Sequence, residues 1–245
     1  MADSSKITPK IAEICGVITG DGHLSRYISP KRTDYRVEVF GDKTEEVDYF
    51  QYLFLLFQKS LGRTFKIKIK KDCIHLYKHS KEILEFFEEI GIIVGKKSDK
   101  ARIPKLILND PILSLKFLRG LADTDFSMCF KKGARRNNSY PRICAEFASQ
   151  KMIKDIQIIL DRIGITYCKQ KVIRHNLFGV FIHYRLQING RKNLSKWMNL
   201  IGFSNPKHLT KIKVWKNLGY CPPRTTYSER LKIINRSRKI NLPTS

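Results

Sequence analysis

Two similar apolar segments occur in this chain, and this internal repeat limits its possible folds more than any other feature. Residues 14–22 read ICGVITGDG, and residues 118–126 read LRGLADTDF. Both segments have small residues at matching places and an aspartate near the end, Asp21 in the first and Asp125 in the second. Because the two aspartates are separated by nearly half the chain, the sequence predicts a duplicated unit.

A helix-start signal precedes each of the two segments. Thr8-Pro9 stands before the first and Asp110-Pro111 before the second. In each pair a side chain that can cap a helix is followed by a proline, which suits the first helical turn. We therefore expect a helix to run from each proline toward its aspartate.

The segments that follow each aspartate show the same order of patterns. After Asp21 we expect strands at about 24–30 and 35–41, a helix ending near 61–62, strands at about 64–70 and 73–78, and a helix closing at 90–91. After Asp125 we expect strands at about 127–132 and 141–148, a helix ending at 163–164, strands at about 166–173 and 180–188, and a helix closing at 201–202. Both halves therefore read αββαββα, which predicts an α+β fold with helices on one face of a mainly antiparallel sheet.

The repeat also predicts the organisation of the chain. We expect an N-terminal repeat over residues 1–100 and a C-terminal repeat over 101–217, in which 101–110 form a linker. The pattern stops after Leu218, and residues 218–245 form a basic extension interrupted by Cys221-Pro222-Pro223. Ser228 could cap a short helix through Ile234, and the extension reads either as a phosphate-contacting arm or as a partly ordered tail.

Charge points to the class of partner. The 47 Lys and Arg residues exceed the 22 Asp and Glu residues, which leaves a formal charge of +25 on a chain that is 42% hydrophobic and can bury a core. A folded body with this excess usually binds a polyanion, so nucleic acid is the first candidate and an anionic membrane surface the second. Because no apolar run approaches the ~20 residues of a membrane span, we expect no membrane partner. The first six residues do not read as a secretory signal, so we expect an intracellular protein in a prokaryotic cytoplasm.

Six cysteines are scattered through the chain without a C-x-x-C pair, which favours reduced thiols in an intracellular compartment. Cys73, His75 and His79 are close enough in sequence to suggest a zinc site. We disfavour this site because Cys73 and His75 alternate as strand residues do and no fourth ligand is near.

Basic and polar side chains follow the period-two alternation of the expected strands. In residues 66–70, three lysines alternate with two isoleucines, and in 184–189 polar residues alternate with Tyr184, Leu186 and Ile188. Such a face can contact phosphates and base edges. The residues that we expect on it are Arg26, Arg36, Glu38, Lys66, Lys68, Lys70, Arg142, Lys169, Lys171, Arg185, Gln187 and Asn189.

The two repeated helices are predicted to pack against each other. Gly16 and Gly20 are four residues apart, as are Gly120 and Thr124, and small residues at this spacing let two helix backbones approach closely. This packing would bring Asp21 and Asp125 together, where a divalent cation would relieve their repulsion. Carboxylate-bound divalent cations support phosphodiester hydrolysis, so the pair predicts a metal-dependent nuclease site.

The two segments resemble the signature helices of the double-motif LAGLIDADG homing endonucleases, and the resemblance covers about residues 8–217. It implies two pseudosymmetric αββαββα units whose antiparallel sheets form a saddle on double-stranded DNA. It also implies a monomer that cleaves both strands across the minor groove at a long site with Mg²⁺, for which other divalent cations can substitute. The usual target is an allele that lacks the intron or intein, and we expect intron encoding here. At the metal-ligand positions stand Asp21 and Asp125, with the carbonyls of Gly20 and Thr124 in support.

The family also tends to place a polar residue at the start of the second helix of each repeat and a lysine after the last helix. The polar residue matches Asp42 or Lys43 in the first half and Gln150 or Lys151 in the second, and we expect Gln150 to contact DNA. The lysine matches Lys97 in the first half and Lys207 in the second, and we expect both to be catalytic, with Lys96 as the next candidate.

Two departures from the family pattern bear on activity. Phe126 stands where the family has a glycine that could leave the helix with positive φ, so the second half-site is expected to be distorted. Asp42 is acidic where glutamine is common, and it would repel phosphate unless a metal or lysine intervenes.

The alternative function is a nucleic-acid-binding protein on the same fold that cuts weakly or no longer cuts, either a DNA-binding regulator or a maturase that binds intron RNA. Phe126 supports this alternative, whereas two retained aspartates speak against it. Self-splicing of the intein type is disfavoured because Met1 is no nucleophile and the sequence does not end in His-Asn.

Overall fold

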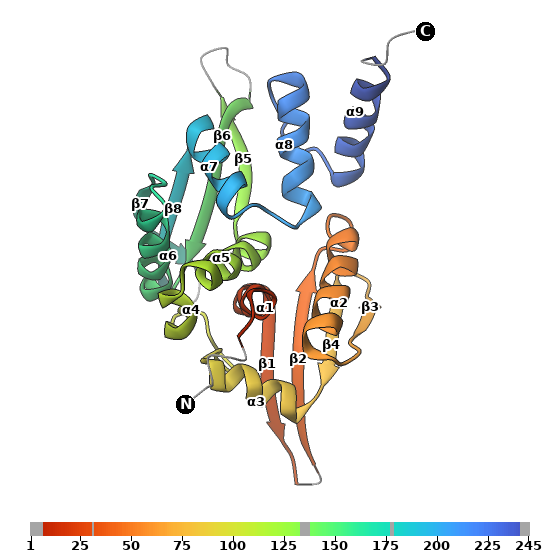
Figure 1. Cartoon of the computed structure of the whole chain (residues 1–245), viewed down its shortest axis with the longest axis vertical. Coiled ribbons are helices and arrows are strands. Elements are labelled where there is room, and N and C mark those ends of the chain that lie inside the picture. Colours follow the sequence, from red (N-terminus) through yellow and green to blue (C-terminus); the bar gives the residue numbers. More distant parts are fainter. Residues whose placement is uncertain (1–6, 31, 133–137, 177–178, 241–245) are drawn as a thin grey trace.

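The computed structural model describes residues 7–30, 32–132, 138–176 and 179–240, and its elements repeat the order αββαββα (Figure 1). The first repeat comprises α1 (Pro9–Thr19), β1 (Gly22–Ile28), β2 (Thr33–Gly41), α2 (Val47–Leu61), β3 (Lys66–Ile69), β4 (Ile74–His79) and α3 (Lys81–Ile90). The second comprises α5 (Pro111–Asp125), β5 (Ser127–Lys132), β6 (Asn138–Phe147), α6 (Gln150–Arg162), β7 (Cys168–Asn176), β8 (Gly179–Asn189) and α7 (Arg191–Leu200). The predicted α+β fold and the order of its elements are confirmed. Residues 1–6, which were not expected to form a secretory signal, lie outside the described ranges.

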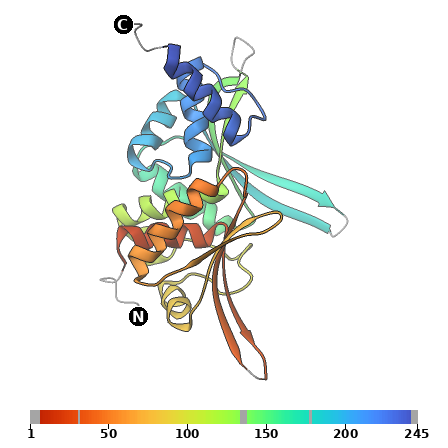
Figure 2. The same ribbon diagram turned by 90° about the vertical axis from the view of Figure 1, so that its right-hand side faces the viewer.

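Each repeat folds its strands into one four-stranded antiparallel sheet. Sheet 1 has the order β1-β2-β4-β3 and sheet 2 the equivalent order β5-β6-β8-β7. The helices lie on one side of the sheets, and the β1–β2 and β7–β8 hairpins project away from them (Figure 2). One face of each sheet is therefore covered by helices, and the other is left for a ligand.

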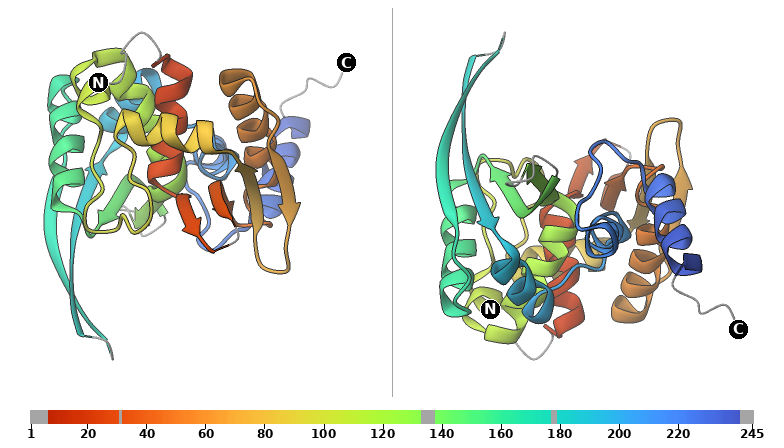
Figure 3. Two further views of the ribbon diagram at one scale, coloured as in Figure 1. Left: turned by 90° about the horizontal axis from the view of Figure 1, so that it is seen from below. Right: turned by 90° about the horizontal axis from the view of Figure 1, so that it is seen from above.

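Helices α1 and α5 lie side by side between the two sheets (Figure 3). Their starts are as predicted, because the side chain of Thr8 caps α1 and that of Asp110 caps α5. Their backbones are in close contact: a Cβ at Gly16 would lie 2.1 Å from the carbonyl oxygen of Phe117, and one at Gly120 would lie 2.1 Å from that of Glu13. Only glycine fits these two places, which confirms the predicted small-residue packing.

A buried polar network crosses the same helix pair. Glu13 of α1 is 2% exposed and forms an ion pair with Arg119 of α5. Its carboxylate also accepts a hydrogen bond of 2.6 Å from the Tyr52 hydroxyl and one of 3.3 Å from the Ser204 hydroxyl. A buried charge must have such partners, so this network links the two repeats through their common core.

Within the described residues, three further helices lie outside the repeated pattern: α4 (Lys105–Asn109), α8 (Pro206–Leu218) and α9 (Tyr227–Ile240). The segment expected as a linker thus contains α4. In the part of the extension that the structure describes, α9 packs against α8 and the Arg230 side chain is fully buried, so this part is folded against the body of the protein. Contact of the extension with phosphate stays a prediction. No helix in the described ranges is long and apolar enough to cross a membrane.

The expected distortion at Phe126 is not found. Its backbone angles, φ −90° and ψ 154°, are ordinary extended values, and its buried ring packs against Phe147 and Trp197. At the equivalent position Gly22 also has no positive φ; a Cβ there would lie 2.4 Å from the Ile18 Cα. The family glycine is therefore needed in the first repeat for a close approach, and the second repeat accommodates an aromatic ring.

Strand register corrects three of the expected positions. Arg26 is paired across the sheet with Tyr35 on the helix-covered face, where its guanidinium forms a 2.6 Å ion pair with Glu88 of α3. Lys169 is paired with Leu186, and Lys171 with Tyr184, so both lie on the α6 side of sheet 2. These three residues do not belong to the open polar faces, because pairing with the neighbouring strand decides which face each side chain occupies.

Candidate functional site

The ends of α1 and α5 meet at the centre of the molecule and bring Asp21 and Asp125 together. A Cβ at Gly20 would lie 2.0 Å from Thr124 Oγ1 and 2.8 Å from Asp125 Oδ2, so the two helix ends are in contact. Among the described residues, neither carboxylate has a hydrogen-bond donor or an ion-pair partner within bonding distance. The site therefore holds two carboxylates whose charges are not matched by direct contacts.

The surroundings of this pair disfavour its negative charge. Burial and then the charge of Asp21 raise the pKa of Asp125 to about 7, against the opposing effect of Lys97 and Lys207. The pKa of Asp21 is also raised, first by burial and then by the charge of Glu46. Part of Asp125 faces solvent, but it lies at the end of a groove of about 390 Å³ along sheet 2, where the protein displaces much of the surrounding water.

Lys97 lies against the end of α1. Its ammonium donates hydrogen bonds to the carbonyl oxygens of Ile18 at 2.7 Å, Gly20 at 2.6 Å and Gly22 at 2.5 Å. Burial lowers the pKa of Lys97 to about 8, against the opposing effect of both aspartates. Lys97 therefore lies beside the carboxylate pair, as expected. One of the carbonyls that accept its hydrogen bonds is that of Gly20, which was expected to support a metal.

Lys207 reaches the site from α8, where its backbone N–H is capped by Asn205. Its ammonium lies 2.7 Å from a carboxylate oxygen of Glu46, the residue that precedes α2. Glu46 is the functional candidate that sequence reasoning missed. The polar residue was sought at Asp42 or Lys43, but α2 begins only at Val47, and a better estimate of the helix start would have pointed to Glu46.

The four other residues considered near the helix starts do not converge on the carboxylates in the same way. Asp42 turns back on its own loop and accepts hydrogen bonds from Thr44 and Glu45, so its charge is satisfied locally. Lys43 donates to the carbonyl of Lys71. Gln150 and Lys151 are the first two residues of α6, behind the Ser149 cap, and Gln150 lines a hollow beside Arg185.

The open face of sheet 2 presents pre-oriented polar groups. Arg142 donates to Asn189 at 2.7 Å, and Glu146 accepts from Arg185 at 2.9 Å and from Arg174 at 2.6 Å. The groove beside Asp125 is lined by the expected Arg142, Arg185 and Gln187, together with Ser127, Cys129, Lys131, Cys144 and Glu146. A polar surface thus continues from the carboxylate pair along sheet 2.

The open face of sheet 1 is built differently. Arg36 pairs with Asp34 at 2.6 Å, and Glu38 lies 3.1 Å from His75. The His75 ring is stacked between those of Phe40, at 4.4 Å, and Tyr77, at 4.7 Å. The expected lysines occupy its edge: Lys66 and Lys68 on β3, and Lys70 just after it, over the Phe40 ring.

Comparison with known proteins identifies this arrangement. Residues 113–202, which span the second repeat, match the family described as the LAGLIDADG-like domain. A variant of the homing endonuclease I-DmoI superposes with a TM-score of 0.58 at 16% identity, over 81% of this chain and 97% of the other. The second repeat therefore matches a LAGLIDADG-like domain, and the chain as a whole shares the fold of I-DmoI. The I-SmaMI K262A mutant superposes with a TM-score of 0.55 at 13% identity, over 97% of this chain and 100% of the other.

Curated relatives share only part of their length with this chain. The replication factor C small subunit of Methanocaldococcus jannaschii is 30% identical over 212 residues, which are 86% of this chain and 10% of that protein. A glutamine–fructose-6-phosphate aminotransferase of the same organism is 26% identical over 216 residues, 86% of this chain and 18% of that protein. The chain therefore spans about a tenth and a fifth of these two relatives.

The residues at the seam where α1 and α5 end fit a hard divalent cation. Carboxylate and carbonyl oxygens are the donors that Mg²⁺ accepts, and Mg²⁺ usually keeps several water ligands. Asp21 and Asp125 would be the acidic ligands at the seam, since their carboxylates lie together there without a direct partner in the described part of the chain. Their unmatched charge and raised pKa values are the physical reason why a cation would bind there.

Near the seam, His208 makes the stability of the fold sensitive to pH. It is 1% exposed and packs on Phe203, and burial, followed by the charges of Lys207 and Lys211, lowers its pKa well below the ordinary value. Unfolding lets it take up a proton, so the stability that it contributes is full above about pH 6.5 and is lost as the pH falls below that value.

We expect the His208→Phe variant to remove this part of the pH dependence. Between pH 8 and pH 5 the wild type should lose up to about 2 kcal/mol more than the variant, because protonation of one unfolded histidine is worth about 1.4 kcal/mol per pH unit. Urea unfolding at the two pH values measures the difference. Equal losses in both proteins would contradict the assignment.

Proposed function

We propose that this protein is a monomeric, site-specific DNA endonuclease that uses Mg²⁺, or a substituting divalent cation, to cut both strands across the minor groove. The observation that carries the proposal is the pair of unmatched carboxylates, Asp21 and Asp125, at the joint between two polar sheet faces. Related folds support it: I-DmoI has been crystallised with DNA and Mn, and I-SmaMI with an uncleaved DNA target and calcium ions. We further propose a homing role from within an intron.

In this proposal Asp21 and Asp125 hold the divalent cation, which when bound supplies an activated water and stabilises charge on the scissile phosphate. Gly20 and Thr124 would support it through their carbonyls. Lys97 and Lys207 place two positive charges beside the same aspartates. These ammonium groups would attract the phosphate and stabilise the negative charge that grows during hydrolysis.

The two sheets would supply recognition. Residues 1–100 and 101–217 would each contact one half of a long target. On sheet 2, Arg142 and Arg185 are held by neighbouring side chains and can offer paired donors to guanine, while Gln187 and Asn189 suit adenine. On sheet 1 the proposed contacts are Arg36, Glu38, Lys66, Lys68 and Lys70, and Gln150 would add one from α6.

Selection from a library of random DNA duplexes tests this function. The protein is incubated with the library and Mg²⁺ or EDTA, and new DNA ends are sequenced. We expect Mg²⁺-dependent ends at one long, tolerant motif. Salt-dependent binding without any metal-dependent nick would refute cleavage and leave the alternative function, a maturase or a DNA-binding regulator. Phe126 no longer supports that alternative, because its backbone angles are ordinary.

A further inference from the structure

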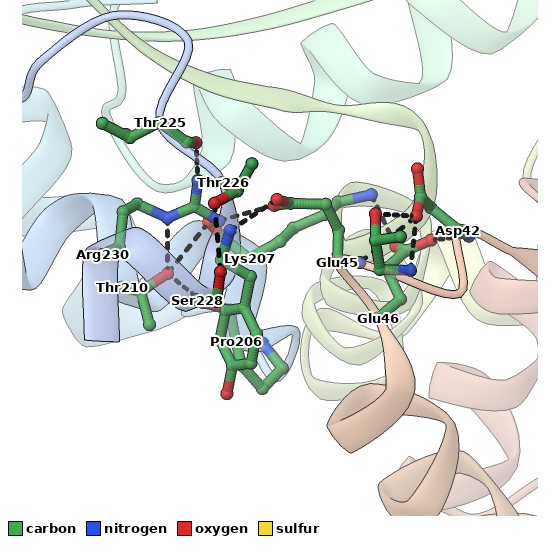
Figure 4. A network of polar contacts seen from close by, with 12 residues as sticks. Asp42, Glu45, Glu46, Pro206, Lys207, Thr210, Thr225, Thr226, Ser228 and Arg230 are labelled. Atoms are coloured by element: carbon green, nitrogen blue, oxygen red, sulfur yellow. Dashed lines mark hydrogen bonds and ion pairs between the residues drawn. The ribbon is translucent and has the colours of Figure 1, made fainter. Parts of the chain in front are cut away.

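An acidic pair, Glu45 and Glu46, stands directly before α2 and is held mainly by the C-terminal part of the chain (Figure 4). The Glu46 carboxylate accepts hydrogen bonds from Lys207 at 2.7 Å, Asn205 at 2.8 Å and the backbone N–H of Asp42 at 2.8 Å. All its bonds but one come from residues about 160 positions away in the sequence. The start of α2 is therefore positioned across the two repeats.

The neighbouring Glu45 is held by α9. One of its oxygens accepts from the backbone N–H of Tyr227 at 2.6 Å, and the other forms a 2.6 Å ion pair with Arg230. Arg230 also donates to the Thr210 hydroxyl of α8 at 2.9 Å and to the carbonyl of Thr225. This one guanidinium thus joins α8, the segment before α9 and the acidic pair.

The charged groups in these contacts are buried, so each needs a partner of opposite charge or a hydrogen bond. The Arg230 side chain is 0% exposed and that of Glu46 is 6% exposed, so each charge depends on its partners. Lys207, by contrast, has a long flexible side chain that is 20% exposed and lies close enough to influence the pKa of both Asp21 and Asp125. Without Glu46, its ammonium would lose its fixed place and would exchange between solvent and the aspartates, where it would compete with a cation.

We propose that Glu46 is a positioning residue, which holds the Lys207 ammonium beside the carboxylate pair and away from direct contact with it, and that α9 anchors this arrangement through the Arg230–Glu45 ion pair. The catalytic importance of this arrangement rests on the proposed nuclease function, but the placement of Lys207 can be measured without DNA or metal.

The first measurement is the acylation rate of Lys207 by an N-hydroxysuccinimide ester, read by mass spectrometry in the free protein. Glu46→Ala should raise this rate about tenfold because the ammonium loses its main acceptor. Glu46→Gln should raise it less because an acceptor oxygen remains. The control, Glu89→Ala at an exposed position on α3, should leave the rate unchanged. An unchanged rate in folded Glu46→Ala would overturn the proposal.

The second measurement is the single-turnover nicking rate with Mg²⁺. Glu46→Ala should slow nicking about 10- to 100-fold with little change in DNA affinity, as is usual for groups that orient a catalytic side chain. Glu46→Gln should restore part of the rate, and Glu46→Ala should add nothing in a Lys207→Met background. Additive losses would overturn the positioning role, whereas absence of nicking by the wild type, with labelling as expected, would refute only the nuclease function.

The anchor is tested with Arg230→Met, examined well below its unfolding temperature. We expect faster Lys207 acylation than in the wild type, because Glu45 loses its partner and the start of α2 is released. Wild-type acylation in a folded Arg230→Met protein would overturn the role of α9. If this variant does not fold, Glu45→Gln, which weakens the same ion pair, replaces it, and wild-type acylation in that variant would likewise overturn the role of α9.

Discussion

Replacing either Asp21 or Asp125 by asparagine is expected to abolish double-strand cleavage while DNA binding persists. Asparagine keeps the shape of the side chain but removes the charge that attracts the cation, so the rate should fall at least about a hundredfold. Binding should persist because the polar sheet faces do not depend on either residue. Loss of the Asp21 charge should also lower the pKa of Asp125, since Asp21 raises that pKa.

A supercoiled plasmid that carries the selected target measures this effect, because nicked and linear products separate on a gel. Exposed Asp72→Asn, at the β3–β4 turn, is the matched control and should cut like the wild type. A second readout is the carboxyl titration of Asp125 by NMR in the metal-free Asp21→Asn protein. Full linearisation by either seam variant would show that the carboxylate pair is not the cation site.

Local sequence signals sufficed for the repeated architecture. The capping pairs at Thr8-Pro9 and Asp110-Pro111, together with apolar periodicity, correctly predicted both long helices and the hairpins that follow. The contact between α1 and α5 could also be predicted, because glycine four residues from another small residue has few other uses on an apolar helix. These features depend on residues close together in the sequence.

What could not be predicted depends on partners far away in the chain. Arg26 alternates like its neighbours, but only its register with Tyr35 shows that it faces α3. Phe126 looked unsuited to the end of α5 because its neighbours in the sequence do not show the aromatic pocket that holds it. That pocket includes Trp197 and is formed by distant segments. Glu46 is one of several polar residues near the start of α2, and only its contact with Lys207 of α8 distinguishes it from the others. The helix α8 itself was overlooked, although Asn205-Pro206 is an ordinary helix start.

Replacing Gly120 by alanine is expected to destabilise the whole protein by about 3 kcal/mol or more. Alanine favours a helix over glycine by about 1 kcal/mol, so a simple propensity argument predicts the opposite sign. The added methyl, however, would lie 2.1 Å from the carbonyl oxygen of Glu13 and 3.0 Å from the backbone nitrogen of Val17. Because both obstacles are backbone, no side-chain rotation relieves them, and α1 and α5 must separate.

Separation of α1 and α5 would also stretch the ion pair between Glu13 and Arg119 and widen the gap between Asp21 and Asp125. Urea unfolding measures the stability loss, and exposed Ile112→Ala at the start of α5 is the control, expected to stay within about 0.5 kcal/mol of the wild type. The Gly120→Ala protein should also need more Mg²⁺ for cleavage, because its two acidic ligands are further apart. Stability equal to or above that of the wild type would mean that the helix pair is not packed backbone to backbone, and the cation site at its end would lose its structural basis.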